Sequence, residues 1–384
     1  MSKTKIPEKT KLRLWVKAGG RCEYKGCNEP LWQDALTLSK MNAAYIAHIV
    51  ADSPNGPRGD EQLSEQLASD INNLMLMCDE HHRLIDKEDV EGHPVERLRE
   101  MKNSHEIRIE MVTSIGEDMQ SHVLFYGANV GEHSSPLNWN DTTCAMLPNK
   151  YPAEKPAIGL SLGNSSFRDD QDLYWKIESE HLKNQFNDKV KRRLELNDIH
   201  HLSVFALAPQ PLLIFLGTLI SDIYSTDVYQ LHREPRTWKW QNEPDDFEYI
   251  VHEPTTVYKK VALNLSLSGN IDNSRITNVL GTDTSIWTIT VPSPYVDFLK
   301  GENQLREFRV VLRKLFNKIK LVHGQENQLH IFPATPVAAA IELGRVWMPK
   351  ADLPILIYDE NKKVGGFHYA FSVGENSLQQ FSAT

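Results

Sequence analysis

The stretch Asn72–Asp86, NNLMLMCDEHHRLID, decides how the first part of this chain can fold. Its apolar run Leu74–Met77 has the length of a short buried strand, and Cys78 follows that run directly. Acidic residues come next, and they suit the first turn of a helix because its N-terminus carries partial positive charge. On such a helix the adjacent His81 and His82 would point about 100° apart, so they can serve two different sites.

Three of the four cysteines belong to two short-spaced pairs. Four residues separate Cys22 from Cys27, and two separate Cys78 from His81. Two such pairs divided by a longer loop are typical of a tetrahedral zinc site, whose preferred ligands are thiolate and imidazole. We therefore expect a structural Zn²⁺ bound by Cys22, Cys27, Cys78 and His81. Four cysteines in 384 residues argue against a disulfide scaffold and predict a cytoplasmic location.

The composition excludes some classes of protein. A hydrophobic fraction of 40% and a charged fraction of 24% are ordinary for a globular protein, and a net charge of −9 excludes a bulk polycation. Residues 1–25 nevertheless carry eight Lys or Arg against two Glu, which predicts either an edge that faces a polyanion or a solvated helix face. The N-terminal residues Met1–Pro7 contain no apolar segment, so no secretory signal is expected.

The uncharged run Leu202–Ser221 is long enough to raise the question of a membrane span. Pro209 and Pro211 lie in its middle, so a buried strand, a turn and a buried helix explain it better. We therefore expect no membrane partner.

A composition break near residues 113–121 predicts two domains, 1–115 and 116–384. In the second, strand-like and helical runs alternate, which indicates an α/β fold. The pattern Phe-x3-Pro-x7-Gly occurs at Phe205–Gly217 and again 127 residues later at Phe332–Gly344. It reads as a strand, a tight proline turn and a helix packed closely enough to need glycine. Its repetition predicts two related halves in one module.

Three elements of the first domain share an order with a known nuclease family. Ala47-His48-Ile49 is followed by Asn73-Leu-x-Leu-x-Cys78 and then by a helix-like run that contains His82. In this order the chain resembles the HNH (ββα-metal) nucleases over about residues 12–110. The resemblance implies that His48 is the general base that activates water, that Asn73 orients it or holds a metal, and that His82 ligates a catalytic Mg²⁺ or Mn²⁺.

One departure from the family concerns that catalytic ion. Many members carry an acidic residue or a histidine just before the general base, where this chain has Ala47. The resemblance then leaves Asp52 or Asp86 as candidates to complete the shell, or a metal that keeps more waters.

The second domain resembles the SAVED domain, a fusion of two CARF-like (Rossmann-like) halves, over about residues 122–380. The matching stretches are His201–Pro211, His330–Pro336, Gly344–Trp347 and Leu353–Asp359. The whole chain is similar to the HNH–SAVED effectors of bacterial CBASS, an anti-phage signalling system. The resemblance implies an effector that cleaves double-stranded DNA once a cyclic di- or trinucleotide binds. It also implies a homo-oligomer whose assembly the messenger promotes.

Ligands of open α/β sheets bind beyond the carboxyl ends of the strands. An amide such as Gln210 can read base edges there, and an aromatic ring such as Phe332 can stack on a purine. Core packing for Phe332, turn geometry for Pro209 and surface exposure for Trp238 are the alternatives. The expected messenger-binding residues are Asn129, Pro209, Gln210, Trp238, Phe332 and Thr335.

The stretch Gly159–Gly163 has the Gly-x-Ser-x-Gly spacing of a hydrolase nucleophile elbow. A polar loop follows it instead of a helix, so a loop that holds a phosphate or ribose is the better hypothesis.

Two other functions stay open at this point. The chain can be an ungated restriction-type endonuclease whose C-terminal half reads DNA, or a regulatory binding protein with an inert zinc finger. The net negative charge of residues 116–384 argues against the first of these.

Overall fold

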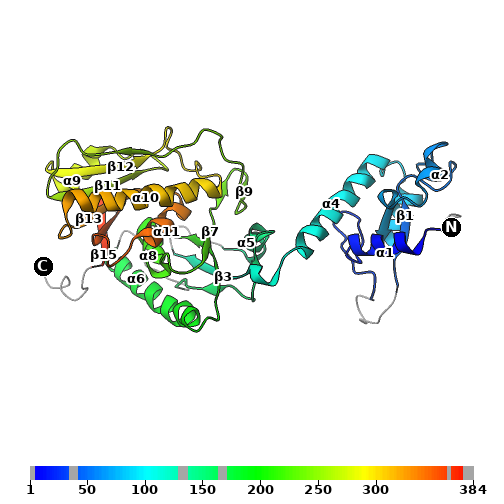
Figure 1. Ribbon diagram of the computed structural model, residues 1–384, viewed down its shortest axis with the longest axis horizontal. Coiled ribbons are helices and arrows are strands. Elements are labelled where there is room, and N and C mark those ends of the chain that lie inside the picture. The colour runs from blue at the N-terminus through cyan, green and yellow to red at the C-terminus, as the bar shows by residue number, and fades with distance from the viewer. Residues whose placement is uncertain (1–4, 34–41, 129–136, 163–170, 361–364, 375–384) are drawn as a thin grey trace. The chain divides into compact units, whose positions relative to one another are not determined.

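The computed structural model describes residues 5–33, 42–128, 137–162, 171–360 and 365–374 (Figure 1). Asn129 of the expected messenger site and Gly163 of the serine motif lie outside these residues. The chain divides into two compact units, Met1–Gly116 and Glu117–Thr384. Within the described part, no helix combines the length and the apolar character that crossing a bilayer requires.

The first unit is built around an antiparallel pair of strands, β1 (Tyr45–His48) and β2 (Leu74–Met77), in which His48 lies opposite Leu74. All four residues of β2 are buried, as its uninterrupted apolar sequence predicts. The helices α1 and α4 contribute Leu14 and Leu98 to the same buried core as these strands. The helical elements of this unit are α1 (Glu8–Lys17), α2 (Leu63–Leu67), η1 (Ile71–Asn73), α3 (Asp79–Arg83), the π-helical η2 (Leu84–Glu88) and α4 (Val95–Thr113).

The second unit contains two sheets. The strands of the first are β3 (Gln120–Gly127), β4 (Tyr151–Pro152), β5 (Ile158–Gly159), β6 (Leu202–Leu207) and β7 (Thr226–Val228). They pair in parallel in the order β4-β3-β6-β7, and β5 also pairs with β3. The strands of the second are β10 (Ile250–His252), β11 (Lys260–Ser266), β12 (Thr284–Thr290), β13 (Leu329–Ala334), β14 (Ile355–Glu360) and β15 (Phe367–Val373). Their order is β10-β12-β11-β13-β14-β15, with parallel central pairs and antiparallel edge strands.

Most helices of this unit pack with both sheets into one large core, whereas α5 and α9 contribute to two smaller buried clusters. Their bounds are η3 (Glu117–Met119), α5 (Trp139–Met146), α6 (Asp172–Phe186), η4 (Asn187–Lys191), α7 (Arg192–Glu195), α8 (Gln210–Ile220), α9 (Asn273–Leu280), α10 (Glu302–His323) and α11 (Val337–Val346). A short hairpin joins β8 (His232–Arg233) to β9 (Arg236–Thr237). In Figure 1, α8 and α11 lie in the middle of the unit, between the strands of the two sheets.

The repeated sequence pattern forms the same structure twice. Strand β6 leads through Pro209 into α8, and β13 leads through Pro336 into α11, with each proline at the N-cap of its helix. Gly217 and Gly344 then bring the two helices together: a Cβ on Gly217 would lie 2.0 Å from the carbonyl oxygen of Ile341. The prediction of a strand, a proline turn and a closely packed helix in each half is confirmed. The run 202–221 is accordingly a buried strand and a buried helix.

A buried arginine also joins the two halves. The guanidinium of Arg345 in α11 donates hydrogen bonds to three carbonyl oxygens after α8, those of Ser221, Tyr224 and Thr226, at 3.1–3.3 Å. It also pairs with Glu342 at 2.6 Å, so its charge is compensated although only 3% of the residue is exposed.

We predict that Gly217→Ala destabilises the second unit by about 2–3 kcal/mol, because the new methyl group meets a backbone carbonyl that cannot rotate away. Chemical denaturation followed by circular dichroism measures the change. Gly269→Ala is the matched control, since no atom lies within 4 Å of the added Cβ, and we expect a change of less than about 1 kcal/mol. Equal stability of the two variants would contradict the close-packing interpretation.

Candidate functional site

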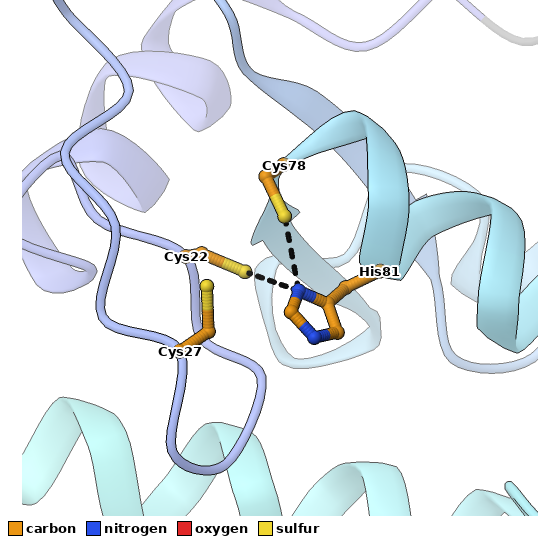
Figure 2. A group of neighbouring side chains, drawn as sticks. All are labelled: Cys22, Cys27, Cys78 and His81. Carbon is orange, nitrogen blue, oxygen red and sulfur yellow. Dashed lines mark hydrogen bonds between the residues drawn. The ribbon is translucent and has the colours of Figure 1, made fainter. Parts of the chain in front are cut away.

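Four side chains of the first unit converge on one point (Figure 2). The donor atoms of Cys22, Cys27, Cys78 and His81 all lie within 4.8 Å of one another. The Nδ1 atom of His81 is 3.0 Å from the sulfur of Cys78 and 3.9 Å from that of Cys22. Three sulfurs and one imidazole nitrogen at this spacing fit the tetrahedral coordination of Zn²⁺.

Two backbone elements deliver these ligands. Cys78 directly follows β2 and is the N-cap of α3, which places His81 one turn further along the helix. The loop after α1 supplies Cys22 and Cys27, and Gly26 within it has a φ of 91°, a left-handed value that favours glycine.

A buried carboxylate anchors that loop to the sheet. The backbone N–H of Glu23 donates to the carbonyl of Leu76 at 2.9 Å, and the carboxylate of Glu23 accepts from the N–H of Leu76 at 2.5 Å. Glu23 is fully buried, with Lys102 3.8 Å away. Spacing along the chain gives no sign of this anchor, because Glu23 and Leu76 are far apart in sequence.

Burial determines the chemistry of the thiols. It raises the pKa of Cys22 and that of Cys78, because a thiolate is disfavoured away from water. A bound cation is the kind of partner that stabilises such thiolates. The ring of Tyr24 covers the cluster by stacking on His81 at a centroid distance of 4.1 Å.

A second group of residues comes from β1, α3 and η2. The imidazole of His82 stacks on the ring of Tyr45 at 5.1 Å, and its Nε2 atom is 3.5 Å from a carboxylate oxygen of Asp86. His48 is 8% exposed, and its Nε2 atom lies 2.9 Å from the carbonyl oxygen of Ala68. A carbonyl only accepts, so Nε2 of His48 carries the proton and Nδ1 keeps a free lone pair.

The prediction for Asn73 needs correction. Its side-chain oxygen accepts from the backbone N–H of Val50 at 2.8 Å, and its amide nitrogen donates to the carbonyl of Val50 at 2.8 Å and to that of Leu67 at 3.2 Å. With its amide committed to the backbone and 3% of the residue exposed, Asn73 orients neither His48 nor a metal directly. It instead secures the chain two residues after His48.

Arg58 is a residue of this group that the sequence analysis missed. Its side chain is 5% exposed and pairs with Asp86 at 2.6 Å. It lies in the turn-forming stretch SPNGPRG at residues 53–59, which is a sign in the sequence that the chain turns here.

In the second unit, two of the expected messenger residues contact each other across the halves. The side-chain oxygen of Gln210 accepts from the N–H of Thr335 at 3.0 Å and from its hydroxyl at 2.9 Å. Both lone pairs of that oxygen are thereby used, so only the amide nitrogen of Gln210 is left to read a base. Pro209 is buried at the N-cap of α8, which agrees with its alternative role in turn geometry.

The two expected aromatic residues are buried in different clusters. Phe332 is fully buried, stacked on Tyr358 at 4.5 Å with Phe367 edge-on at 5.2 Å, so the prediction that it stacks on a purine is not compatible with this packing. Trp238 is 5% exposed and meets Phe205 edge-on at 5.2 Å. It borders a cavity of about 350 Å³ together with Arg236 and Lys239, among others.

The serine of the Gly-x-Ser-x-Gly stretch has a structural partner. The hydroxyl oxygen of Ser161 accepts a hydrogen bond from the backbone N–H of Gly127 at 2.8 Å. This bond ties the end of β5 to the end of β3.

Comparisons with known proteins give a family for the second unit. Residues 182–373 match the SAVED family, described as "SMODS-associated and fused to various effectors sensor domain". No curated protein matches the chain.

Several solved structures have some likeness to it. The Acinetobacter baumannii Cap4 SAVED/CARF-domain containing receptor with the cyclic trinucleotide 2'3'3'-cAAA is 13% identical, with a TM-score of 0.42 over 72% of this chain and 61% of that one. The same receptor with 3'3'3'-cAAA is 14% identical, with a TM-score of 0.40 over 82% of this chain and 71% of that one. The Moraxella osloensis Cap4 receptor is 10% identical, with a TM-score of 0.37 over 72% and 60%. The chain thus spans less than two thirds of the first of these receptors.

We predict that Cys78→Ser lowers the zinc content of the purified protein well below about one ion per chain and unfolds the first unit, because structural zinc contributes folding free energy directly. Elemental analysis and limited proteolysis measure the two effects. Cys144→Ser is the matched control, since Cys144 is an exposed free thiol in α5. Full zinc content in the Cys78 variant would show that the ligand set is wrong.

Proposed function

This chain belongs to the SAVED family, and on that premise we propose that it is a messenger-gated effector of the CBASS type. A cyclic di- or trinucleotide binds the unit Glu117–Thr384, and the unit Met1–Gly116 then cleaves double-stranded DNA as an HNH endonuclease. The observation that carries the proposal is the pair His48 and His82, held on a strand and a helix beside a Cys3His cluster, in a chain whose other unit is a sensor domain.

The chemistry of phosphodiester hydrolysis requires a group that takes a proton from water. His48 suits this task because its Nδ1 atom has a free lone pair that can accept a proton. The carbonyl of Ala68 fixes the tautomer by accepting from Nε2. Near-complete burial of His48 restricts the ring to one orientation.

The negative charge of the scissile phosphate calls for a cation. His82 is 28% exposed in its side chain and so is open to a ligand, and Asp86 beside it is 24% exposed. A Mg²⁺ or Mn²⁺ held by His82 would stabilise the charge that develops on the phosphate. Ala47 is 1% exposed and contributes no ligand, so water or an acidic neighbour completes the shell.

Exposed positive charge near α1 offers the nuclease unit a surface for binding DNA. Lys5, Lys9 and Arg13 are exposed at and before α1, whereas Lys11 and Lys17 pair with acidic side chains. Phosphate contacts need only exposed cations of this kind. Cutting both strands requires two nuclease units, and we propose that the messenger promotes the assembly of a homo-oligomer that supplies them. The messenger can do this only if it binds the assembled state more tightly.

A plasmid-cleavage screen tests the proposal. We expect DNA degradation with Mg²⁺ or Mn²⁺ only when one of a panel of cyclic di- and trinucleotides is added. Full cleavage without any nucleotide would favour an ungated restriction-type enzyme, and no cleavage under any condition would leave a binding protein with an inert zinc finger.

We predict that His48→Ala lowers the cleavage rate by about 10²–10⁴-fold, the usual contribution of a general base, while zinc content and nucleotide binding stay unchanged. Single-turnover kinetics measure the rate. His252→Ala, at an exposed histidine of β10, is the control and should cleave at the wild-type rate. A His48 variant that also cleaves at that rate would rule this imidazole out as the base.

A further inference from the structure

Arg58 connects the end of β1, which carries His48, to η2, which directly continues the helix α3 that carries His82. Its Nε atom donates to the carbonyl of Ile49 at 2.8 Å, and one Nη atom donates to the carbonyl of Ile85 at 2.6 Å. The other Nη atom donates to the carbonyl of His48 at 3.3 Å and to Oδ1 of Asp86 at 2.6 Å. A single guanidinium therefore holds the end of β1 against the π-helical turn η2.

Asp86 extends this connection to His82. Because Oδ1 of Asp86 is bound to Arg58, Oδ2 is the oxygen that faces Nε2 of His82, 3.5 Å away. Nε2 is thus the ring nitrogen on the side of this carboxylate, and Nδ1 is the nitrogen that remains for a cation. Metal-binding histidines generally donate their second ring N–H to such a carboxylate or carbonyl. Stacking on Tyr45 restricts the same ring from its face.

The loop that returns Arg58 to this position is tightly constrained. Arg58 has a φ of 57°, a left-handed value that is unfavourable for a side chain of this size. At the next residue, a Cβ on Gly59 would lie 2.2 Å from the carbonyl oxygen of Pro54. The hydrogen bonds of the guanidinium offset this conformational cost and the cost of burying its charge.

We propose that Arg58 is a positioning residue of the metal-dependent centre: through Asp86 it directs Nδ1 of His82 toward the cation, and through the carbonyls of β1 it holds His48 in place. The inference rests on the proposed nuclease function. It assigns Asp86 to orienting His82 instead of to the open ligand position left by Ala47.

The test compares Arg58→Lys, Asp86→Asn and their combination in the full-length protein. Lysine keeps the charge but cannot bridge three carbonyls and a carboxylate at once. We expect either single change to weaken Mn²⁺ binding by about 10–100-fold, as loss of an outer-shell partner does. Electron paramagnetic resonance of free Mn²⁺ measures this binding without reference to cleavage. The double variant should bind Mn²⁺ with no lower affinity than the weaker-binding single variant, because the two residues act in series.

Arg83→Lys is the matched control. Arg83 pairs with Asp79 one turn along the same helix, and both side chains are 53% exposed. We expect this variant to bind Mn²⁺ within about twofold of wild type. In cleavage assays, Arg58→Lys should lower the single-turnover rate at limiting Mn²⁺ while DNA affinity stays within about twofold of wild type. General loss of structure would lower both the rate and the DNA affinity.

The outcomes separate the inference from the function on which it rests. Wild-type protein that binds Mn²⁺ and cleaves, together with an Arg58→Lys variant that does both equally well, would overturn the inference alone. Wild-type protein that neither binds Mn²⁺ nor cleaves would overturn the proposed function and the inference with it. If Arg58→Lys loses its zinc and unfolds, Asp86→Asn decides, and unchanged Mn²⁺ binding in that variant would contradict the role of Asp86.

Discussion

The convergence of three thiols and one imidazole is the constraint on which the first unit depends. A pair of four-residue strands is marginally stable by itself, so β1 and β2 need support from outside the sheet. The cluster provides it, since Cys78 directly follows β2, is the N-cap of α3 and lies against the two cysteines of the loop after α1. His82 follows His81 directly along α3, so the position of the four clustered side chains also determines the position of His82.

Local spacing along the chain predicts part of this protein. The ligand set from Cys22 to His81 and the two strand–proline–helix units follow from residues that are neighbours in sequence or that repeat at a fixed distance. The role of Arg58 does not follow, because its partners lie 9–28 positions away and meet it only through the path of one tight loop. The burial of Phe332 does not follow either, because residue spacing locates a strand but does not reveal which neighbours fill the space beside it. Asn73 is a third such case, since an amide can serve the backbone as well as an active site.

The two halves of the second unit are joined by contacts of different kinds. Where α8 and α11 cross, backbone meets backbone at Gly217 and Gly344, and little rearrangement is possible. Near the starts of those helices, the link is the directional pair of hydrogen bonds from Thr335 to Gln210. Hydrogen bonds can be exchanged for bonds to a ligand, whereas a close backbone contact cannot. A response to a bound ligand is therefore easier at the strand ends than at the helix crossing.

The crossing of α8 and α11 has a consequence for how such a protein diversifies. A contact made by main-chain atoms does not depend on which side chains surround it, so the remainder of each half is free to drift after a duplication. The two small residues are not free in this way, because enlarging either one displaces the opposite helix. Divergent copies of this module should therefore be recognisable by their paired glycines long after their binding surfaces have ceased to look alike.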